Sequence, residues 1–322
     1  ATPAADEVAI SVLHAATAVK GADVDVYVTV PDADISGTDA NFSFDFKGQV
    51  DAGPLAAGKY QIRIVADGDT ANPAYDSGEV DLSPYAGQKL LLLAVNTVNS
   101  TTKDASPVKL VAYTDSAQVE LLDTRTTAGA RVVHLSPDAG AVEVFASSTV
   151  LGADSPLEII DSFSYTQTDP SDGVSYTYVP AADDYTFTVS GAGNGFDNPA
   201  YTSPGPLELI TAGEYTVIAA GYLGTDPMFE LKPTQDSNRA IVTLARVKVI
   251  HGAPLAGTVD VFVTPAGQFT KEQVENGAAG ATLLDDFTYG TITSYVPVTP
   301  GDYDIRVVTD GGAGTAAIDV RA

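Results

Sequence analysis

The chain has 322 residues, no cysteine and a net charge of −26, from 42 acidic and 16 basic side chains. A surface of this sign repels phosphate backbones and anionic lipids, so neither nucleic acid nor a membrane surface is an expected partner. The lack of cysteine excludes disulfides, thiolate zinc sites and cysteine nucleophiles. No apolar run in the sequence approaches the ~20 residues of a membrane-spanning helix.

Taken in chain order, the first predicted strand ends in a histidine, and a turn leads to a second short strand. Apolar and polar residues alternate in both segments, which is typical of half-buried β-strands. The same pair of segments occurs three times, at residues 8–14 and 24–28, 130–138 and 142–145, and 245–254 and 259–263. The three histidines of the protein, His14, His134 and His251, occupy the same place in the three copies.

Further segments also recur along the chain. A turn, a tyrosine and an alternating strand follow in each copy, with the tyrosine at Tyr60, Tyr185 and Tyr303. The apolar strand predicted at 86–95 matches 212–220, and each is followed by one more short strand. About seven short strands per copy, separated by turn residues, predict a β-sandwich. Only residues 270–276 suggest helix, as a single turn in a loop.

We therefore predict an all-β chain of three tandem immunoglobulin-like β-sandwich domains at residues 1–125, 126–240 and 241–322. The third copy lacks its last strands in this chain, since nothing in it corresponds to 90–95 or 108–111. Three explanations stay open at this point. The chain is a fragment of a longer protein, or another chain supplies the missing strands by strand addition, or the third copy has a smaller sheet.

The repeated segments resemble the prokaryotic family called domain of unknown function 4397. The resemblance rests on the strand that ends in histidine, the Ser136-Pro137-Asp138 turn, the Val-Asp-Val-Tyr type of strand and the Gly-x-Tyr strand. It covers nearly the whole chain, although the first copy has no proline in its opening turn. It implies exported, tandem immunoglobulin-like modules with no accepted activity. Residues 1–6 are interpreted as a tether left after processing, which agrees with an extracellular or cell-surface location.

Each histidine is followed about ten residues later by an acid. The pairs are His14 with Asp25, His134 with Glu143, and His251 with Asp260. One interpretation is a metal site in each copy, but two ligands do not complete a site and no third ligand follows at a fixed spacing. We favour a hydrogen bond that anchors the turn. The acid lies between apolar residues, so it is expected to point away from the core.

The tyrosines and the acidic loops allow further interpretations. The repeated tyrosines are typical of a tyrosine corner, in which the hydroxyl bonds the backbone across a loop; a sugar-binding platform is the alternative. Weak candidates for calcium ligands are Asp32, Asp34, Asp39, Asp67 and Asp69. None of their loops has the spacing of a calcium-binding loop, and turn formation explains them as well.

No catalytic motif is present in the sequence, and the copies share no second residue suited to catalysis. We expect a non-catalytic secreted or cell-surface structural or adhesive protein that needs no cofactor, with calcium left open. The alternatives are a subunit of an extracellular filament whose third domain is completed by a β-strand from another chain, or a calcium- or carbohydrate-binding module of an exported enzyme system. The expected partners are other protein chains, copies of itself among them, and surface glycans.

Overall fold

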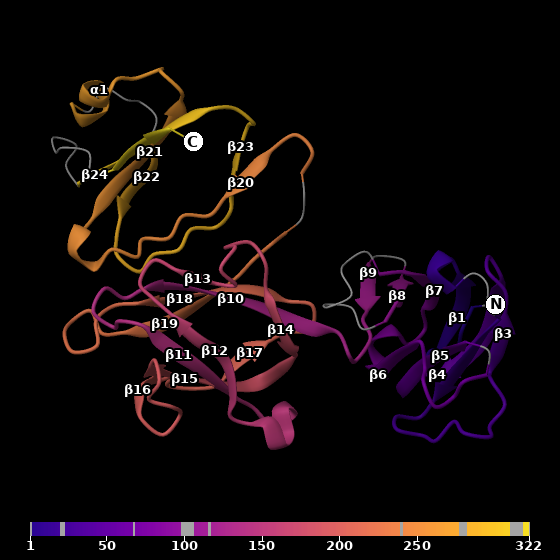
Figure 1. Cartoon of the computed structure of the whole chain (residues 1–322). Helices are drawn as coiled ribbons and strands as arrows, with labels where there is room; N and C mark the ends of the chain where they lie inside the picture. The colour runs from indigo at the N-terminus through magenta and orange to yellow at the C-terminus, as the bar shows by residue number, and fades with distance from the viewer. Residues whose placement is uncertain are drawn as a thin grey trace. The chain divides into compact units, whose positions relative to one another are not determined.

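The computed structural model describes residues 2–19, 23–66, 68–97, 106–114, 117–238, 241–276, 282–309 and 318–321. The regular secondary structure of these residues is almost entirely β-strand and forms several sheets, which confirms the predicted all-β class with multiple β-sandwiches (Figure 1). By backbone proximity the chain divides into two units, one of residues 1–129, 178–183 and 208–213, the other of 130–177, 184–207 and 214–322. The domain boundaries predicted at 125/126 and 240/241 stay a prediction. Below, "repeat" means one of the three segments 1–125, 126–240 and 241–322.

The first repeat contains two facing sheets. One has the order β4-β1-β7-β8-β9 and the other β3-β2-β5-β6. Their strands are β1 (Glu7–His14), β2 (Val24–Thr29), β3 (Phe42–Phe44), β4 (Gln49–Ala56), β5 (Lys59–Ala66), β6 (Tyr75–Asp81), β7 (Lys89–Asn96), β8 (Val108–Tyr113) and β9 (Gln118–Leu121), with short 3-10 turns at Thr17–Val19 and Ser83–Tyr85.

Strand β1 shows why this sequence forms a sandwich. Its residues alternate strictly between half-buried and buried, with Val8, Ile10, Val12 and His14 inward. It pairs antiparallel with β4 on one side and parallel with β7 on the other. β7 and β8 supply six of the sixteen buried residues of the first core, which are Leu90, Leu92, Ala94, Val108, Leu110 and Ala112. The apolar segment that begins at Leu90 is therefore a strand, as predicted, and it lies at the centre of its sheet.

The second repeat has the same two sheets. Their orders are β13-β10-β18-β19 and β12-β11-β15-β16. The strands are β10 (Thr127–Leu135), β11 (Val142–Ser147), β12 (Leu157–Phe163), β13 (Thr168–Asp169), β14 (Thr177–Pro180), β15 (Ala182–Gly191), β16 (Pro199–Thr202), β17 (Leu207–Leu209), β18 (Glu214–Ala220) and β19 (Glu230–Gln235), with a 3-10 segment at Thr149–Asp154.

The sequence alignment of β7 with β18 is wrong by one residue. In the first repeat the N–H of Ala9 donates to the carbonyl of Gln88, and in the second repeat the N–H of Gly129 donates to the carbonyl of Gly213. Ala9 and Gly129 both lie five residues before the histidine of their repeat. Gln88 therefore corresponds to Gly213, not to Glu214, and Leu92 corresponds to Val217. A one-residue shift reverses which side chains face the core.

The third repeat keeps one sheet of this pattern. The order β22-β21-β24-β25 matches β3-β2-β5-β6 and β12-β11-β15-β16, which confirms that the unit is repeated. The second sheet contains only β20 and β23, and the residues that the structure describes here include no counterpart of β7, β8 or β9. The strands are β20 (Ala245–Val247), β21 (Val259–Pro265), β22 (Thr282–Phe287), β23 (Val296–Val298), β24 (Tyr303–Thr309) and β25 (Ile318–Arg321), with a 3-10 turn at Pro254–Ala256.

The single helical turn expected near residue 270 is confirmed as helix α1 (Lys271–Glu275). It begins with a capping box, in which the side chain of Thr270 accepts from the N–H of Gln273, and the side chain of Gln273 accepts from the N–H of Thr270. These bonds satisfy backbone donors that the first turn of a helix leaves free. Val274 anchors the turn against Phe262 and Val308 on the outer side of the four-stranded sheet.

Two tyrosines of the first repeat allow a matched stability test. Tyr75 is fully buried and donates to the carbonyl of Leu121 at 3.0 Å, whereas Tyr60 is only half-buried and donates to the carbonyl of Ala56 at 2.8 Å. We expect Tyr75→Phe to cost about 1–2 kcal/mol, because the hydroxyl belongs to a fully buried side chain and its lost hydrogen bond is not replaced by water. Tyr60→Phe should cost clearly less. Urea unfolding of both variants checks this, and equal losses would contradict it.

Candidate functional site

The three histidines lie at equivalent ends of equivalent strands. His14 ends β1, His134 is the penultimate residue of β10, and His251 follows β20 at the end of the same extended segment. Their side chains are buried, with exposures of 1%, 0% and 6%. The three histidines, which the sequence predicts to be equivalent, therefore occupy equivalent positions in the structures of their repeats.

The hydrogen bonds of the imidazoles repeat as well. Nδ1 accepts the N–H of the residue two positions later, which is Ala16, Ser136 or Ala253, at 3.3 Å in each case. Nε2 bonds the carbonyl six positions later, of Gly140 for His134 and of Gly257 for His251, at 2.9 Å. A carbonyl can only accept, so Nε2 carries the proton and these two rings are neutral. Both nitrogens are engaged by the turn, which leaves no lone pair for a metal. The residue six positions after His14 is outside the described part of the chain.

Two aromatic rings flank each histidine. They come from one residue pair at i and i+2, with centroids 5.2–6.5 Å from the imidazole. The pairs are Phe44 and Phe46, Phe163 and Tyr165, and Phe287 and Tyr289. Our sequence reasoning missed them, although the spacing aromatic-x-aromatic is legible in all three repeats. The two aromatic rings of each pair contact the imidazole and help to bury it.

The acids that follow the histidines have partners of their own. Asp25 accepts from the hydroxyl of Ser43, and Asp260 accepts from the N–H of Asp286 at 3.1 Å. Glu143 is 4% exposed and accepts from two backbone N–H groups, those of Gly193 (at 3.0 Å) and Gly195. Each acid therefore holds a neighbouring strand or loop, and each histidine holds its own turn. This arrangement favours the structural interpretation over a histidine–carboxylate metal site.

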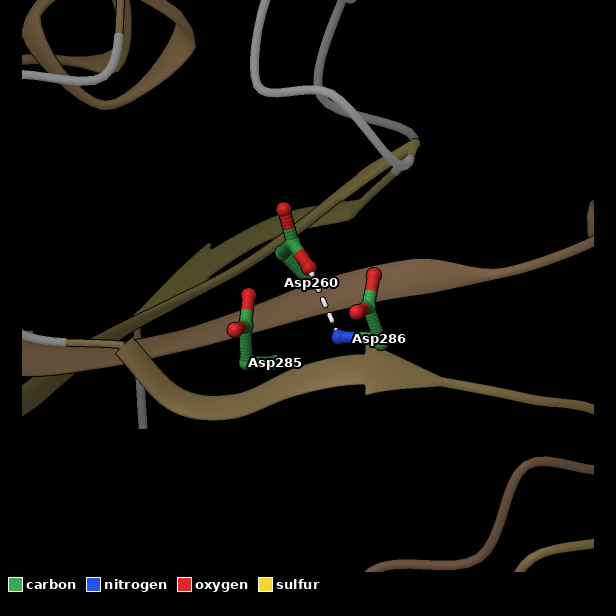
Figure 2. Close-up of side chains that lie close together, drawn as sticks. All are labelled: Asp260, Asp285 and Asp286. Atoms are coloured by element: carbon green, nitrogen blue, oxygen red, sulfur yellow. Dashed lines mark hydrogen bonds between the residues drawn. The ribbon is translucent and has the colours of Figure 1, made fainter.

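A β-bulge changes the surroundings of the acid in the third repeat. Val259 pairs with Phe287 and Val261 pairs with Leu284, so two residues, Asp285 and Asp286, lie opposite Asp260. Their carboxylates project on the same side of the two strands (Figure 2), and one oxygen of each lies within 4.8 Å of the others. In the first repeat the corresponding residue opposite Asp25 is Ser43. Three carboxylates in this arrangement can hold a hard cation such as calcium, with further oxygens from backbone and water.

The acidic loops singled out from sequence are arranged differently. Within the described residues, Asp32, Asp34, Asp39 and Asp69 do not form a group of three carboxylates with oxygens in mutual reach. The carboxylate of Asp34 accepts the N–H of Ser36, which lowers the pKa of Asp34. Asp69 accepts from the side chain of Asn72. These contacts are those of turns. Asp67 lies outside the described residues.

The repeated tyrosines lie at equivalent places on β5, β15 and β24. The hydroxyls of Tyr60 and Tyr303 donate to carbonyls four residues upstream, those of Ala56 and Thr299. This is the contact that a tyrosine corner makes. Tyr185 is fully buried, and burial raises its pKa to about 12.

The neutral histidines predict a pH dependence of stability. Burial lowers the pKa of His134 below its usual 6.5, and the hydrogen bond to Gly140 offsets this in part. The unfolded chain therefore takes up the proton first as pH falls below 6.5. The contribution of the neutral His134 to the free energy of unfolding is complete above pH 6.5. It is lost as the pH falls from 6.5 to the lowered pKa of the folded state, by up to about 1.4 kcal/mol per pH unit.

Urea unfolding between pH 5.5 and 8 measures this effect. His134→Gln removes the titrating group, so we expect the variant to show a shallower dependence on pH than the natural chain. Burial lowers the pKa of His14 in the same direction, so some dependence should remain in this variant. Identical slopes for the two proteins would show that His134 does not take part.

The three carboxylates of the third repeat predict a stabilising substitution. Like charges placed opposite each other across strands destabilise the pair. We expect Asp286→Asn to stabilise the chain by roughly 0.5 kcal/mol in the presence of a chelator. Asparagine also tolerates the left-handed backbone of this residue, where φ is 51°. Thermal unfolding with EDTA checks this, and Asp45→Asn is a control on an exposed aspartate elsewhere. A lower melting temperature for Asp286→Asn would contradict the expectation.

Among curated proteins, no sequence matches this chain. In the described part of the chain, no helix is long and apolar enough to cross a bilayer. A solved structure from Bacteroides ovatus, described as a candidate cell adhesion protein, is 11% identical and covers 73% of this chain and 96% of its own, with a TM-score of 0.22. A candidate adhesin from the same species is 9% identical and covers 72% and 92%, with a TM-score of 0.17. Likenesses this weak carry no argument about function.

The family comparison is specific. The model of the family DUF4397, a domain of unknown function, matches residues 8–145 and again residues 128–262. Each match begins within a strand that carries a buried histidine at its last or penultimate position, and it extends to the acid-bearing strand of the following repeat. The two matches together cover well over half of the 322 residues. The chain belongs to the DUF4397 family.

Proposed function

We propose that this protein is a non-catalytic structural or adhesive protein of the cell surface or the extracellular space, in which tandem β-sandwiches act as spacers and attachment modules. The proposal rests on the hydrogen bonds of the polar residues that the three repeats share. The histidine and the acid that recur in all three repeats are engaged by backbone or neighbouring side chains. What the repeats share is therefore scaffold, and repetition of a scaffold serves spacing and multivalent contact.

The surface chemistry supports the same proposal. A net charge of −26 keeps a multidomain chain soluble and separate from other acidic polymers. The absence of cysteine makes its stability independent of the redox state of the surroundings. Its partners in this proposal are other polypeptides and the glycans of a surface.

Antibody labelling of intact cells tests the proposed location. With the organism that encodes the chain, we expect an antibody against the second repeat to label unbroken cells or the surrounding matrix. A matched culture in which the gene is deleted gives the background, and its attachment to surfaces should be reduced. A signal that requires lysis of the cells would overturn the proposal. A cytoplasmic marker probed in parallel reports whether the cells were intact.

A further inference from the structure

The order of strands in the first repeat decides where tension on the chain enters its sheet. β7 runs parallel to β1, β8 runs antiparallel to β7, and β9 runs antiparallel to β8. β9 therefore runs in the same direction as β1. The start of β1 and the end of β9, where the chain enters and leaves the repeat, thus lie at opposite ends of one sheet. Tension between these two points acts along the strands.

β1 is held along its whole length against such tension. It pairs with β4 on one side and with β7 on the other. Its backbone bonds with the β7 segment extend from Gly87 N–H to Glu7 O at one end to Ala15 N–H to Ala94 O at the other. These bonds lie across the strand direction, so a pull along the strand loads all of them together. β1 can slide out only when the whole ladder breaks.

β9 is short, but the segment that follows it is fastened to the facing sheet. The four residues of β9 pair with β8. The buried hydroxyl of Tyr75 on β6 donates to the carbonyl of Leu121, the last residue of β9, at 3.0 Å. Further on, the N–H of Thr124 donates to the carbonyl of Asp76 at 2.9 Å. The carboxylate of Asp123 accepts the N–H of Asp76, also at 2.9 Å.

Residues 118–125, which we call the latch, end in an ion pair. The side chain of Asp123 is buried, and its two carboxylate oxygens accept from Nε and Nη2 of Arg125 at 2.7 and 2.6 Å. Nη2 also donates to the carbonyl of Pro73 at 3.2 Å. Bidentate pairs of this kind are among the stronger side-chain contacts. The latch therefore joins the sheet of β9 to β6 of the facing sheet through backbone and side-chain bonds.

The second repeat has its entry and its exit at the same end of the corresponding sheet. β10 and β18 begin side by side, since Gly129 N–H donates to Gly213 O, and β19 returns antiparallel to β18. Directly after β19, Asp236 N–H donates to Glu214 O, and its carboxylate pairs with Arg131 on β10 at 3.1 Å. Among the described residues of this repeat, no further strand follows β19 in that sheet. Tension here acts across the strands and separates β19 from β18 one pair at a time.

We propose that the latch is a force-bearing element that makes the first repeat resist tension along the chain, whereas the second repeat, which has no latch, unzips and extends first. Without the latch the chain would leave the first repeat at the end of β8, which lies beside the start of β1 and β7. The first repeat would then be loaded in the same way as the second. This inference rests on the proposed role in attachment, because only a chain that is fixed at two points carries tension.

Two tethering points on the same folded chain separate pulling direction from stability. The chain has no cysteine, so Thr124→Cys in the latch and Tyr113→Cys at the end of β8 each give one thiol at an exposed residue. The second tether is at the N-terminus, and optical tweezers measure the lifetime of the first repeat at constant force. We expect the lifetime to be at least about tenfold shorter with the tether at residue 113, because its bonds then break singly. The proposal is wrong if the two lifetimes are equal.

A substitution in the latch gives a second test with its own control. Asp123→Ala removes the carboxylate that holds Asp76 and Arg125. With the tether at residue 124, we expect this variant to have a lifetime shorter by about tenfold. With the tether at residue 113 the latch is bypassed, so the lifetime should not change. Equal shortening in both geometries indicates a general loss of stability and rules the latch out.

Tension on the two ends of the whole chain tests the order of opening. Twenty glycine and serine residues inserted in an exposed loop, after Asp39 or after Gly224, lengthen the extension of their own repeat by about 7 nm and so identify it. We expect the event marked by Gly224 to occur at lower force than the event marked by Asp39. The reverse order overturns the proposal. Such a failure leaves the surface location to be decided separately, by labelling of intact cells.

Discussion

The structure depends on an imidazole that is hydrogen-bonded through both nitrogens to the turn that follows it. In the second and third repeats this bonding fixes a neutral ring, and it ties the end of the opening strand to the residues that begin the next one. Because the turn is fixed, the following strand starts in the facing sheet with its acid outward. The acid is then free to hold a different element, a loop in the second repeat and a bulge in the third. Two polar residues thus position both sheets, and the apolar residues fill the space between them.

Much of this could be read from the sequence, because the pattern is present three times. The equivalence of the histidines, the alternation in β1 and the single turn of α1 were all legible. The one-residue offset between β7 and β18 was not, since the Ala-Gly pair before each strand suggests an alignment that the backbone bonds do not follow. The cluster at Asp260 was also missed. It arises from a bulge, and bulges depend on pairing between strands that are distant in sequence.

The two sheets of the unit differ in whether each is found complete without the other. The sheet that contains β2 and β5 in the first repeat recurs with the same order in every repeat, whether or not its partner sheet is complete. In the third repeat it packs on its outer side against α1 and keeps a smaller core of Val259, Val261 and Phe287. The sheet that begins with the histidine strand is complete only when β7-like and β8-like strands are present.

The way β25 is attached has a consequence for the response of the chain to ionic strength. β6 is anchored in the first repeat by the buried ring of Tyr75, whereas β25 is anchored by charge pairs, one of them through an arginine side chain that is 64% exposed. Added salt screens such pairs, and salting-out ions strengthen the burial of apolar groups. Added salt therefore weakens the ion pairs that attach β25, while the buried contact of Tyr75 on β6 is not screened.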